Sequence, residues 1–369
     1  MKKHLPFLLF FILGAVACNP KAGSEPNPAG AQASAVAETT PKPDRIILMI
    51  GDGMGLTQIT AGMLMNDNYL NLEEFPYIGL IKTRSSDNVI TDSAAGATAF
   101  SAGVKTYNGA IGVDSDENPV PTILELAADR EYATGLVATS SITHATPASF
   151  FAHQPSRSMN EAIAKDMLVA PVDFFIGGGK DFFTQREDQA NLMDSLVSSG
   201  FTFYDNPFDI PSDAQGKIAS LYADKQPLSL LNGRSDELLV QASQKAIENL
   251  SSKDQFFLMI EGSQIDWEGH ANNSEGIVAE MIDFDNTIGA VLDFAKADGN
   301  TLIIVTADHE TGGYSIVGKN EEGQLEGRFT TGGHTGDLIP VFAYGPGSEL
   351  FSGIYENTAI FDKMKSLLK

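Results

Sequence analysis

Acidic residues and histidines gather in a few short stretches that are rich in glycine. Asp52 stands between two glycines, and Asp266 lies four residues before His270. Asp308 directly precedes His309. Carboxylates that are brought together repel one another, and divalent cations are their natural partners. Sets of aspartate and histidine suit zinc, whereas sets of oxygen ligands suit magnesium. These residues therefore predict a centre for divalent metal ions.

Each of these residues also has a plainer interpretation. A lone aspartate after a strand is usually a turn residue or a helix cap, and a lone histidine is usually a surface or core residue. The distribution of the six histidines favours metal binding, because His270, His309 and His334 all lie in polar, glycine-rich stretches beside acids.

Ser93 is a candidate nucleophile. The small residues that follow it favour a helix with Ser93 at or near its start. The free N–H groups and the dipole of a helix N-terminus attract anions. A serine in this position is most often only an N-cap. Beside a metal centre, its hydroxyl would be activated for attack while the helix end holds the transferred group.

Strands and helices alternate from residue 44 onward and would position these side chains. Continuous apolar runs, typical of strands covered on both faces, occupy residues 46–50, 135–138, 256–260, 302–305 and 341–344. Apolar residues at helical spacing predict helices over 236–250, with Ser235 as N-cap, and over 276–295. The alternation predicts an α/β fold with a central, mostly parallel sheet and helices on both faces. Residues 177–235 are less regular and could hold an excursion from this core.

The carboxyl ends of three predicted strands would bring the acids together. Asp52, Glu261 and Asp308 each follow one of the apolar runs. Ligands of open α/β sheets bind beyond the carboxyl ends of the strands, so we expect a single site there. One turn of helix would present Asp266 and His270 to the same metal.

The N-terminus predicts export. A short basic start and an apolar run over residues 5–12 lead through small residues to Cys18, the only cysteine. The run is too short to span a bilayer and is typical of a signal peptide, here 1–17. The segment is similar to bacterial lipoprotein signals, which predicts a periplasmic or cell-envelope protein anchored by a lipid on Cys18; the alternative is an ordinary signal peptide. Residues 18–43 predict a flexible linker, followed by a catalytic domain over 44–369.

Composition excludes several classes of protein. The formal net charge is −24, which argues against a nucleic-acid-binding surface. One cysteine excludes intrachain disulfides and cysteine-rich zinc sites. If the substrate is an anion, the site itself must supply positive charge.

Several motifs resemble those of bacterial alkaline phosphatases, in the order found in that family. The resemblance spans nearly all of residues 44–346. Besides Asp52, the motifs are residues 91–95 (TDSAA), 103–109 (GVKTYNG), 261–266 (EGSQID), 306–309 (TADH) and 333–335 (GHT).

The resemblance implies two zinc ions and a third metal, usually magnesium. Asp266, His270 and His334 would bind the first zinc. The second zinc would be bound by Asp52, Asp308, His309 and the oxygen of Ser93. The third site would share Asp52 and be completed by Thr146 and Glu261.

The resemblance also implies the reaction. Ser93 would attack phosphate monoesters and form a phosphoserine, which water then hydrolyses. Arg157 would bind two non-bridging phosphate oxygens, a role that suits its planar fork of donors. The family further implies a homodimer.

Two positions depart from the enterobacterial pattern of the family. His144 stands where that pattern has aspartate, and Trp267 stands where it has lysine. Both are candidates for the third metal site or its surroundings, and a nitrogen from His144 would suit zinc or cobalt better than magnesium. The stretch between His309 and His334 is short, so a reduced crown-type insertion is expected.

Three other functions remain as alternatives. A phosphodiesterase of the same superfamily typically uses threonine as the nucleophile and lacks the third metal site. A sulfatase would need a Cys/Ser-x-Pro-x-Arg motif, which does not surround Ser93. A non-catalytic lipoprotein that captures phosphate or metal would have no need of Ser93 beside Asp52.

Overall fold

The computed structural model describes residues 41–369. The predicted signal peptide, Cys18 and most of the predicted linker lie outside the described residues. The strands are β1 (Arg45–Gly51), β2 (Tyr77–Lys82), β3 (Ala133–Ser141), β4 (Phe174–Gly178), β5 (Phe201–Phe203), β6 (Lys217–Leu221), β7 (Phe256–Gly262), β8 (Thr301–Thr306), β9 (Glu310–Thr311), β10 (Tyr314–Lys319), β11 (Leu325–Phe329), β12 (His334–Thr335), β13 (Ile339–Tyr344) and β14 (Gly353–Glu356).

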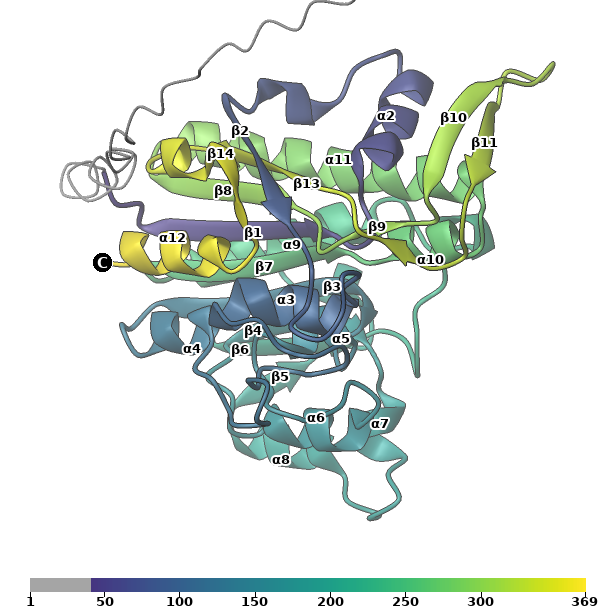
Figure 1. Ribbon diagram of the computed structural model, residues 1–369. Coiled ribbons are helices and arrows are strands. Elements are labelled where there is room, and N and C mark those ends of the chain that lie inside the picture. Colours follow the sequence, from purple (N-terminus) through teal and green to yellow (C-terminus); the bar gives the residue numbers. More distant parts are fainter. Residues whose placement is uncertain (1–40) are drawn as a thin grey trace, which may run out of the picture. The chain divides into compact units, whose positions relative to one another are not determined.

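The helices lie between these strands (Figure 1). The α-helices are α2 (Leu56–Met65), α3 (Ser93–Ala102), α4 (Ile123–Ala128), α5 (Ala145–Ala148), α6 (Asn160–Asp166), α7 (Asp181–Thr184), α8 (Leu192–Ser198), α9 (Leu238–Leu250), α10 (Gln264–His270), α11 (Ser274–Asp298) and α12 (Ala359–Leu367). Four short 3-10 helices are η2 (Asn71–Glu74), η3 (Pro207–Asp209), η4 (Leu230–Asn232) and η5 (Ser348–Phe351).

A ten-stranded sheet forms the centre of the fold, in the order β14-β2-β13-β8-β1-β7-β3-β4-β6-β5. Within this sheet β13 runs antiparallel to both of its neighbours, and the other adjacent strands pair in parallel. The predicted mostly parallel sheet is therefore confirmed, and each of the five apolar runs lies in one of its strands.

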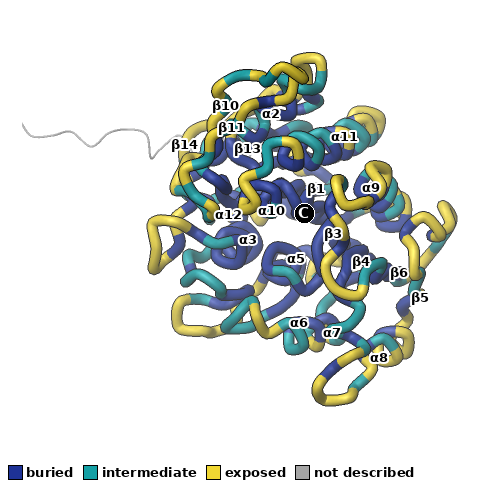
Figure 2. Tube along the Cα trace, turned by 90° about the vertical axis from the view of Figure 1, so that its right-hand side faces the viewer, coloured by how far each residue is buried: buried dark blue, intermediate teal, exposed yellow. Residues whose placement is uncertain are grey.

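Helices cover both faces of this sheet, as predicted. α9 and α11 pack on one face, whereas α4 and α5 pack on the other, with α3 and α12 over them (Figure 1). As a result β3, β7 and β8 are buried at every position (Figure 2). Burying one large aliphatic side chain contributes about 1.5–3 kcal/mol, so these strands form a rigid base for the residues at their ends.

Two sequence predictions need correction. The helix predicted over 236–250 begins at Leu238, and its N-cap is Glu237 rather than Ser235. Residues 177–235 do not leave the core, because β6 and β5 extend the central sheet beside β4. The sequence pattern did not reveal these strands, because β4, β5 and β6 have only three to five residues each and their apolar runs are therefore short.

Two small sheets complete the described part of the chain. β10 and β11 form a hairpin in the stretch that was expected to hold a reduced crown-type insertion. β9 pairs with β12 in antiparallel fashion. Within residues 41–369, no helix is both long and apolar enough to cross a membrane.

Candidate active site and metal centres

The carboxyl ends of β1, β7 and β8 converge on one site, as predicted. Asp52 directly follows β1, Glu261 is near the end of β7, and Asp308 comes two residues after β8. All three side chains are fully buried. β1 is paired with both β7 and β8 in parallel, so the register of the sheet brings their ends together.

Gly53 allows the chain to turn sharply at this edge. Its φ angle is +72°, a conformation that L side chains rarely adopt. A Cβ atom at Gly53 would lie 2.7 Å from the Cα atom of Asp266. Glycine is therefore required for the turn after β1 to approach helix α10, which carries Asp266.

The first cluster consists of Asp266, His270 and His334. One turn of α10 presents Asp266 and His270 together, as their spacing predicts. The Nε2 atom of His270 is 3.3 Å from Asp266 Oδ2 and 3.1 Å from His334 Nε2. The Nδ1 atoms of His270 and His334 lie 2.7 Å from the carbonyl oxygen of Gly332 and 2.9 Å from that of Thr91. These contacts orient the Nε2 atoms of both rings toward the same point.

The second cluster consists of Asp52, Asp308, His309 and Ser93. The Nε2 atom of His309 lies 3.2 Å from Asp308 Oδ2, 3.6 Å from Asp52 Oδ1 and 3.2 Å from the Ser93 hydroxyl oxygen. The rings of His309 and His334 stack with their centroids 3.5 Å apart, so the two clusters adjoin. His309 also falls in a group of potential ligands with Asp266 and His334.

The third cluster joins Asp52 to Glu261 and to His144, at the N-cap of α5. Thr146, the residue carried over by resemblance, is buried in the first turn of the same helix. Ser140 donates a hydrogen bond of 3.1 Å to Glu261 Oε2. The structure thus favours His144, which was predicted here only as a candidate, as a contributor of a nitrogen ligand.

Several donors in these clusters are free to bind a metal. Within the described part of the chain, both carboxylate oxygens of Asp52 and the Oδ2 of Asp308 are buried without a hydrogen-bond partner. The same is true of Glu261 Oε1, Thr146 Oγ1 and His144 Nδ1. A buried polar atom without a partner is costly, so this set of oxygen and nitrogen atoms fits bound divalent cations. The residues therefore suit the metals that the sequence predicts.

The electrostatics of the site agree with this assignment. Burial, together with the neighbouring carboxylates, raises the pKa of Asp52 well above its ordinary value. Burial also raises the pKa of Glu261 to about 7 and that of Asp308 to about 6. Divalent cations would remove this penalty by neutralising the charge.

The histidines of the site differ in how they hold protons. The hydrogen bond to Asp266 raises the pKa of His270 to about 9. Burial lowers the pKa of His309 well below its ordinary value, and burial and Arg157 lower the pKa of His144 to about 3. His309 and His144 are therefore neutral, which is the form that binds metals, whereas His270 must release a proton to do so.

Ser93 is the first residue of helix α3 and is buried beside the second cluster. Its neighbour Asp92, not Ser93, is the N-cap and accepts a hydrogen bond of 3.0 Å from the backbone N–H of Ala95. Because Asp92 does the capping, the Ser93 hydroxyl remains available for chemistry.

Asp92 is a residue that the sequence analysis did not identify. Its Oδ2 lies 3.0 Å from Arg157 NH1, and its Oδ1 also accepts from the N–H of Gly109. The other terminal nitrogen of Arg157 lies 3.2 Å from His144 Nε2. The ring of His144 in turn packs edge-on against Trp267. The position of Asp92 directly before Ser93 was the signal in the sequence that could have identified it, since aspartate is a preferred N-cap residue.

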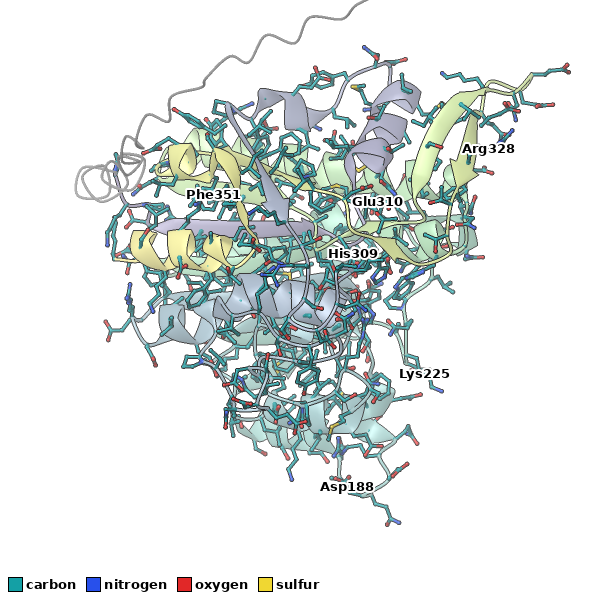
Figure 3. All side chains as sticks on the ribbon, in the orientation of Figure 1. Asp188, Lys225, His309, Glu310, Arg328 and Phe351 are labelled. Atoms are coloured by element: carbon teal, nitrogen blue, oxygen red, sulfur yellow. The ribbon has the colours of Figure 1, made fainter. Side chains whose placement is uncertain are left out.

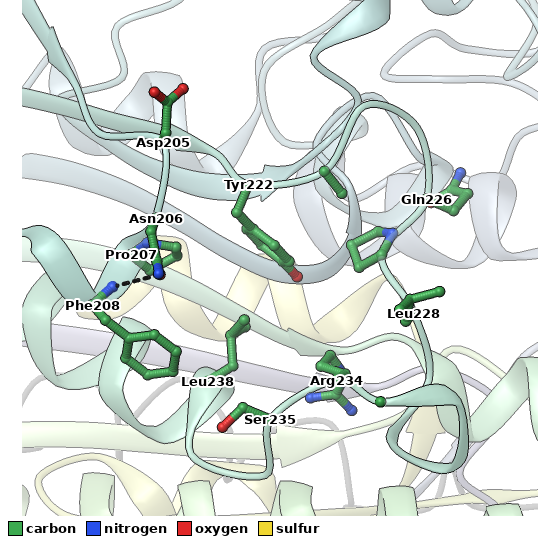
Figure 4. A pocket seen from close by; sticks show the side chains of 13 residues that line it. Asp205, Asn206, Pro207, Phe208, Tyr222, Gln226, Leu228, Arg234, Ser235 and Leu238 are labelled. Carbon is green, nitrogen blue, oxygen red and sulfur yellow. Dashed lines mark hydrogen bonds between the residues drawn. The ribbon is translucent and has the colours of Figure 1, made fainter.

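A separate cavity of about 480 Å³ lies beside the loop that follows β6. Figure 4 shows its lining, which includes Phe208, Tyr222, Arg234 and Leu238. None of the described residues that line it is a predicted site residue. The predicted site residues lie instead at the edge of the sheet near His309, which Figure 3 labels.

Comparison with known proteins places the chain in a family. The family model described as Alkaline phosphatase matches residues 44–327 and 320–369. The chain belongs to the alkaline phosphatase family. Alkaline phosphatase 3 of Bacillus subtilis is 36% identical, with 85% of this chain and 87% of that protein covered. The alkaline phosphatase of Escherichia coli is 32% identical, with 88% and 85% covered.

Solved structures agree. The alkaline phosphatase of the Antarctic bacterium TAB5 is 48% identical, has a TM-score of 0.85, and covers 89% of this chain and 99% of its own. A variant of that enzyme has Mg bound in a site termed M3. As a member of the family, this alkaline phosphatase is a metal-dependent hydrolase of phosphate monoesters. The non-catalytic alternative is therefore wrong.

Proposed function

We propose that the chain hydrolyses phosphate monoesters through a phosphoserine at Ser93. The observation that carries this proposal is the position of the Ser93 hydroxyl at the start of α3, 3.2 Å from His309 Nε2 and beside the unpartnered oxygens of Asp52 and Asp308 in the described structure. This hydroxyl thus combines the N-terminus of a ten-residue helix with contact to a potential metal ligand.

We further propose the metal ligands implied by the family resemblance. Asp266, His270 and His334 hold one zinc, and Asp52, Asp308, His309 and Ser93 hold the second. Asp52, Glu261 and Thr146 would hold the third metal, and His144 is a further candidate ligand there. Bound at these positions, the metals supply positive charge for the attacking and departing oxygens.

The residues of the chain have distinct roles in this reaction. The Ser93 oxygen attacks phosphorus, and the bond to the departing alcohol breaks in line. The N–H groups at the start of α3 and the dipole of that helix stabilise the charge on the phosphoryl group. Arg157, held by Asp92 at 3.0 Å, directs its remaining N–H groups to the non-bridging oxygens. Water then displaces Ser93 and releases phosphate.

The third metal is proposed to be magnesium, with zinc or cobalt as the alternatives. In the TAB5 enzyme, Mg is bound in the M3 site of a variant whose histidine is replaced by glutamate, so magnesium there goes with an added carboxylate. The unpartnered Nδ1 of His144, in the structure as described, supports a metal that accepts nitrogen. Metal analysis of the protein and of His144→Asp decides between them. Substitution by aspartate is expected to raise the magnesium content, and unchanged content would leave His144 outside the third site.

The nucleophile is tested with Ser93→Ala. The variant should lose most activity and form no phosphoenzyme, because the attacking oxygen is gone, yet it should bind metals because the carboxylates and histidines remain. Brief incubation with labelled phosphate at acid pH, followed by quenching, should label the unmodified protein alone. Ser115→Ala, in an exposed loop, is the control and should be labelled normally. Labelling of Ser93→Ala would overturn the assignment.

The substrate class is tested by comparing p-nitrophenyl phosphate with its bis-ester. The monoester should be hydrolysed faster, because it offers Arg157 one more charged oxygen than the diester. Arg157→Ala should therefore lower kcat/KM for the monoester more than for the bis-ester. A larger loss for the bis-ester would favour a phosphodiesterase.

We also propose a homodimer. Apolar side chains on one face of the edge strand β14 and its neighbour β2 support it: Ile78 of β2 is 56% exposed and Ile354 of β14 is 63% exposed. Ile354 pairs with Leu80, so these side chains lie on the same face of the sheet. Ile78→Lys with Ile354→Lys should lower the molar mass measured by light scattering to that of a monomer. A monomeric unmodified protein would contradict the proposal.

Finally, we propose that the protein is exported and anchored in the cell envelope by a lipid on Cys18. The apolar run that ends in small residues before Cys18 supports this. In the bacterial host, labelled palmitate should be incorporated into the full chain but not into Cys18→Ala. Equal labelling of both would contradict the proposed anchor.

A further inference from the structure

A buried carboxylate that takes no part in the proposed reaction lies directly beside the metal clusters. Glu310 is 3% exposed. Its Oε1 accepts hydrogen bonds from Gln58 Nε2 at 2.8 Å and from the N–H of Tyr314 at 3.0 Å. Its Oε2 accepts from the N–H of Gly313 at 3.1 Å and from the Thr335 hydroxyl. Both oxygens are therefore fully used by donors of the protein.

These donors come from three separate segments of the chain. Gln58 lies in α2, Gly313 and Tyr314 lead into the hairpin of β10 and β11, and Thr335 lies in β12. Gln58 Nε2 also donates to the carbonyl oxygen of Thr311 at 2.8 Å. Glu310 thus ties a helix, a turn and a strand to β9 at one point.

The hydrogen bonds of Glu310 also restrain two histidines of the site. Glu310 directly follows His309, and Figure 3 labels the two residues close to each other. Thr335 directly follows His334, and it pairs with Glu310 across the short sheet of β9 and β12. β9 and β12 have only two residues each, so their backbone hydrogen bonds alone hold them weakly. The side-chain bond from Thr335 to Glu310 adds the missing restraint on His334 relative to His309.

Packing prevents Glu310 from moving. A Cβ atom at Gly55 would lie 2.4 Å from Glu310 Cγ, so the backbone after β1 touches the side chain closely. Gln58, whose side chain donates to the same carboxylate, is fully buried. The carboxylate is therefore held in a single position.

We propose that Glu310 is a positioning residue for the metal centre, which sets the separation of His309 and His334 and so raises the affinity for zinc. This inference rests on the proposed function, because it assumes that these histidines bind metal. Glu310 itself touches neither the substrate nor a metal.

The charge state of Glu310 matters as much as its size. In Glu310→Gln, one oxygen becomes an NH₂ group, which is a donor. Placed at Oε1, this group faces the N–H of Tyr314; placed at Oε2, it faces the N–H of Gly313. Thr335 and Gln58 can turn to accept from it, but a backbone N–H cannot. Either orientation therefore leaves one backbone donor without its acceptor and moves β9 relative to β12.

The test measures zinc affinity on the full chain after removal of metals, by competition with a fluorescent zinc chelator. Glu310→Gln is expected to raise the dissociation constant of the zinc sites roughly 10- to 100-fold, as is typical when a partner of a metal ligand is lost. kcat at saturating zinc should recover most of its value, because the ligands themselves are intact.

Asp285→Asn is the matched control. Asp285 is also a fully buried carboxylate, and it accepts from the N–H groups of Asn71 and Leu72 and from the Asn71 side chain. It lies on α11, and its carboxylate hydrogen-bonds to residues of η2 rather than to any of the proposed ligands. Asp285→Asn should therefore lower the free energy of unfolding but leave the zinc dissociation constant within about twofold.

An unchanged zinc affinity in Glu310→Gln would overturn the inference, even if the variant unfolds more easily. If Glu310→Gln does not fold, Thr335→Val decides, since it removes one donor and keeps the shape. It should raise the zinc dissociation constant roughly threefold to tenfold, which is the value of one hydrogen bond. No change in Thr335→Val would overturn the inference. If the unmodified protein binds no zinc, the proposed function fails together with the inference, whereas zinc binding that is equal in all variants refutes the inference alone.

Discussion

Two groups of buried carboxylates in this protein differ in the partners of their oxygen atoms. Asp52, Glu261 and Asp308 gather at the carboxyl end of the sheet, where several of their oxygens have no partner in residues 41–369. Glu280 and Asp283 lie on α11 and both contact the guanidinium of Arg234, which is 2.9 Å from Asp283. Figure 4 shows Arg234 at the cavity wall.

The burial of the acids does not explain the difference between the two groups. Burial raises the pKa of Glu261 and of Glu280 to about 7 in each case. In the second group, however, Arg234 opposes the effect, and Glu280 also accepts from the N–H of Leu230 at 2.8 Å. In the first group, the largest causes after burial are the neighbouring carboxylates, which raise the pKa of Asp52 further. The comparison teaches that the chain neutralises buried acids with its own residues where they serve structure, and leaves them for bound cations where they serve chemistry.

The largest expected effect is that of metal removal. Chelation should lower kcat/KM for p-nitrophenyl phosphate by roughly 10³-fold or more, because the charge stabilisation by the metals is worth several kcal/mol. Activity should return when zinc and magnesium are added. Full activity after exhaustive chelation, checked by metal analysis, would show that the acids at the end of the sheet do not need bound cations for the reaction.

Removing the cation that pairs with Glu280 and Asp283 should lower the stability of the protein but leave its affinity for metals unchanged. Arg234→Met leaves Glu280 and Asp283 buried without their cation, and should lower the free energy of unfolding by about 3–5 kcal/mol. Denaturant unfolding of the metal-loaded protein measures the loss, and zinc competition should show an unchanged affinity. A stability loss below about 1 kcal/mol would mean that the pair is not what satisfies these acids.

The stability of the two forms should diverge with pH. In the metal-free protein, the pKa of Glu261 is raised to about 7 and that of Asp308 to about 6, so their protonated forms favour the folded state. This contribution is present below about pH 4 and is lost as the pH rises to about 7. Bound metals hold the same carboxylates ionised, so the loaded protein does not show this loss.

The difference in unfolding free energy between loaded and metal-free protein should therefore grow by about 2 kcal/mol per pH unit from pH 5 to 7 through Glu261 and Asp308 together. His270, whose pKa is about 9 when metal-free, extends the trend upward. Glu280 contributes equally to both forms and cancels. A difference that stays constant over this range, measured by urea unfolding, would show that the site acids are compensated within the chain.

The smallest expected effect is the change in the free energy of unfolding when one aspartate of each group is replaced by asparagine. This change should have opposite signs in the two groups. Asp308→Asn removes one repelling charge and keeps Oδ1 as acceptor for the N–H groups of Gly53 and His309. It should stabilise the metal-free protein by about 1–2 kcal/mol at pH 8 while greatly weakening zinc binding. Asp283→Asn removes the charge that pairs with Arg234 and should destabilise the protein. If both substitutions changed the free energy of unfolding of the metal-free protein in the same direction, the difference between the two groups would be refuted.

Much of this architecture follows from local patterns. The apolar runs predicted the strands of the core, since a strand buried on both faces must be apolar throughout. The spacing of Asp266 and His270 predicted their place on one turn of α10. The start of α9 was predicted too early, because capping depends on the backbone geometry of a few residues rather than on residue type alone.

Other features depend on contacts between distant segments. Asp92 caps α3 and also holds Arg157, a contact across 65 residues. The network around Glu310 joins segments up to 252 residues apart in the chain. Such contacts leave no periodic signal in the sequence.

By itself, the sequence determined which elements form and which residue types stand at their ends. Hydrophobic periodicity specifies strands and helices locally, and aspartate, histidine and serine have few uses together at strand ends. The tertiary structure decided which atoms meet: that His144 joins Asp52 and Glu261, that β12 brings His334 against His309, and that Arg234 neutralises Glu280. These pairings depend on the register of the assembled sheet and on the packing of its helices, because only there do burial and the loss of water determine which charges remain without a partner.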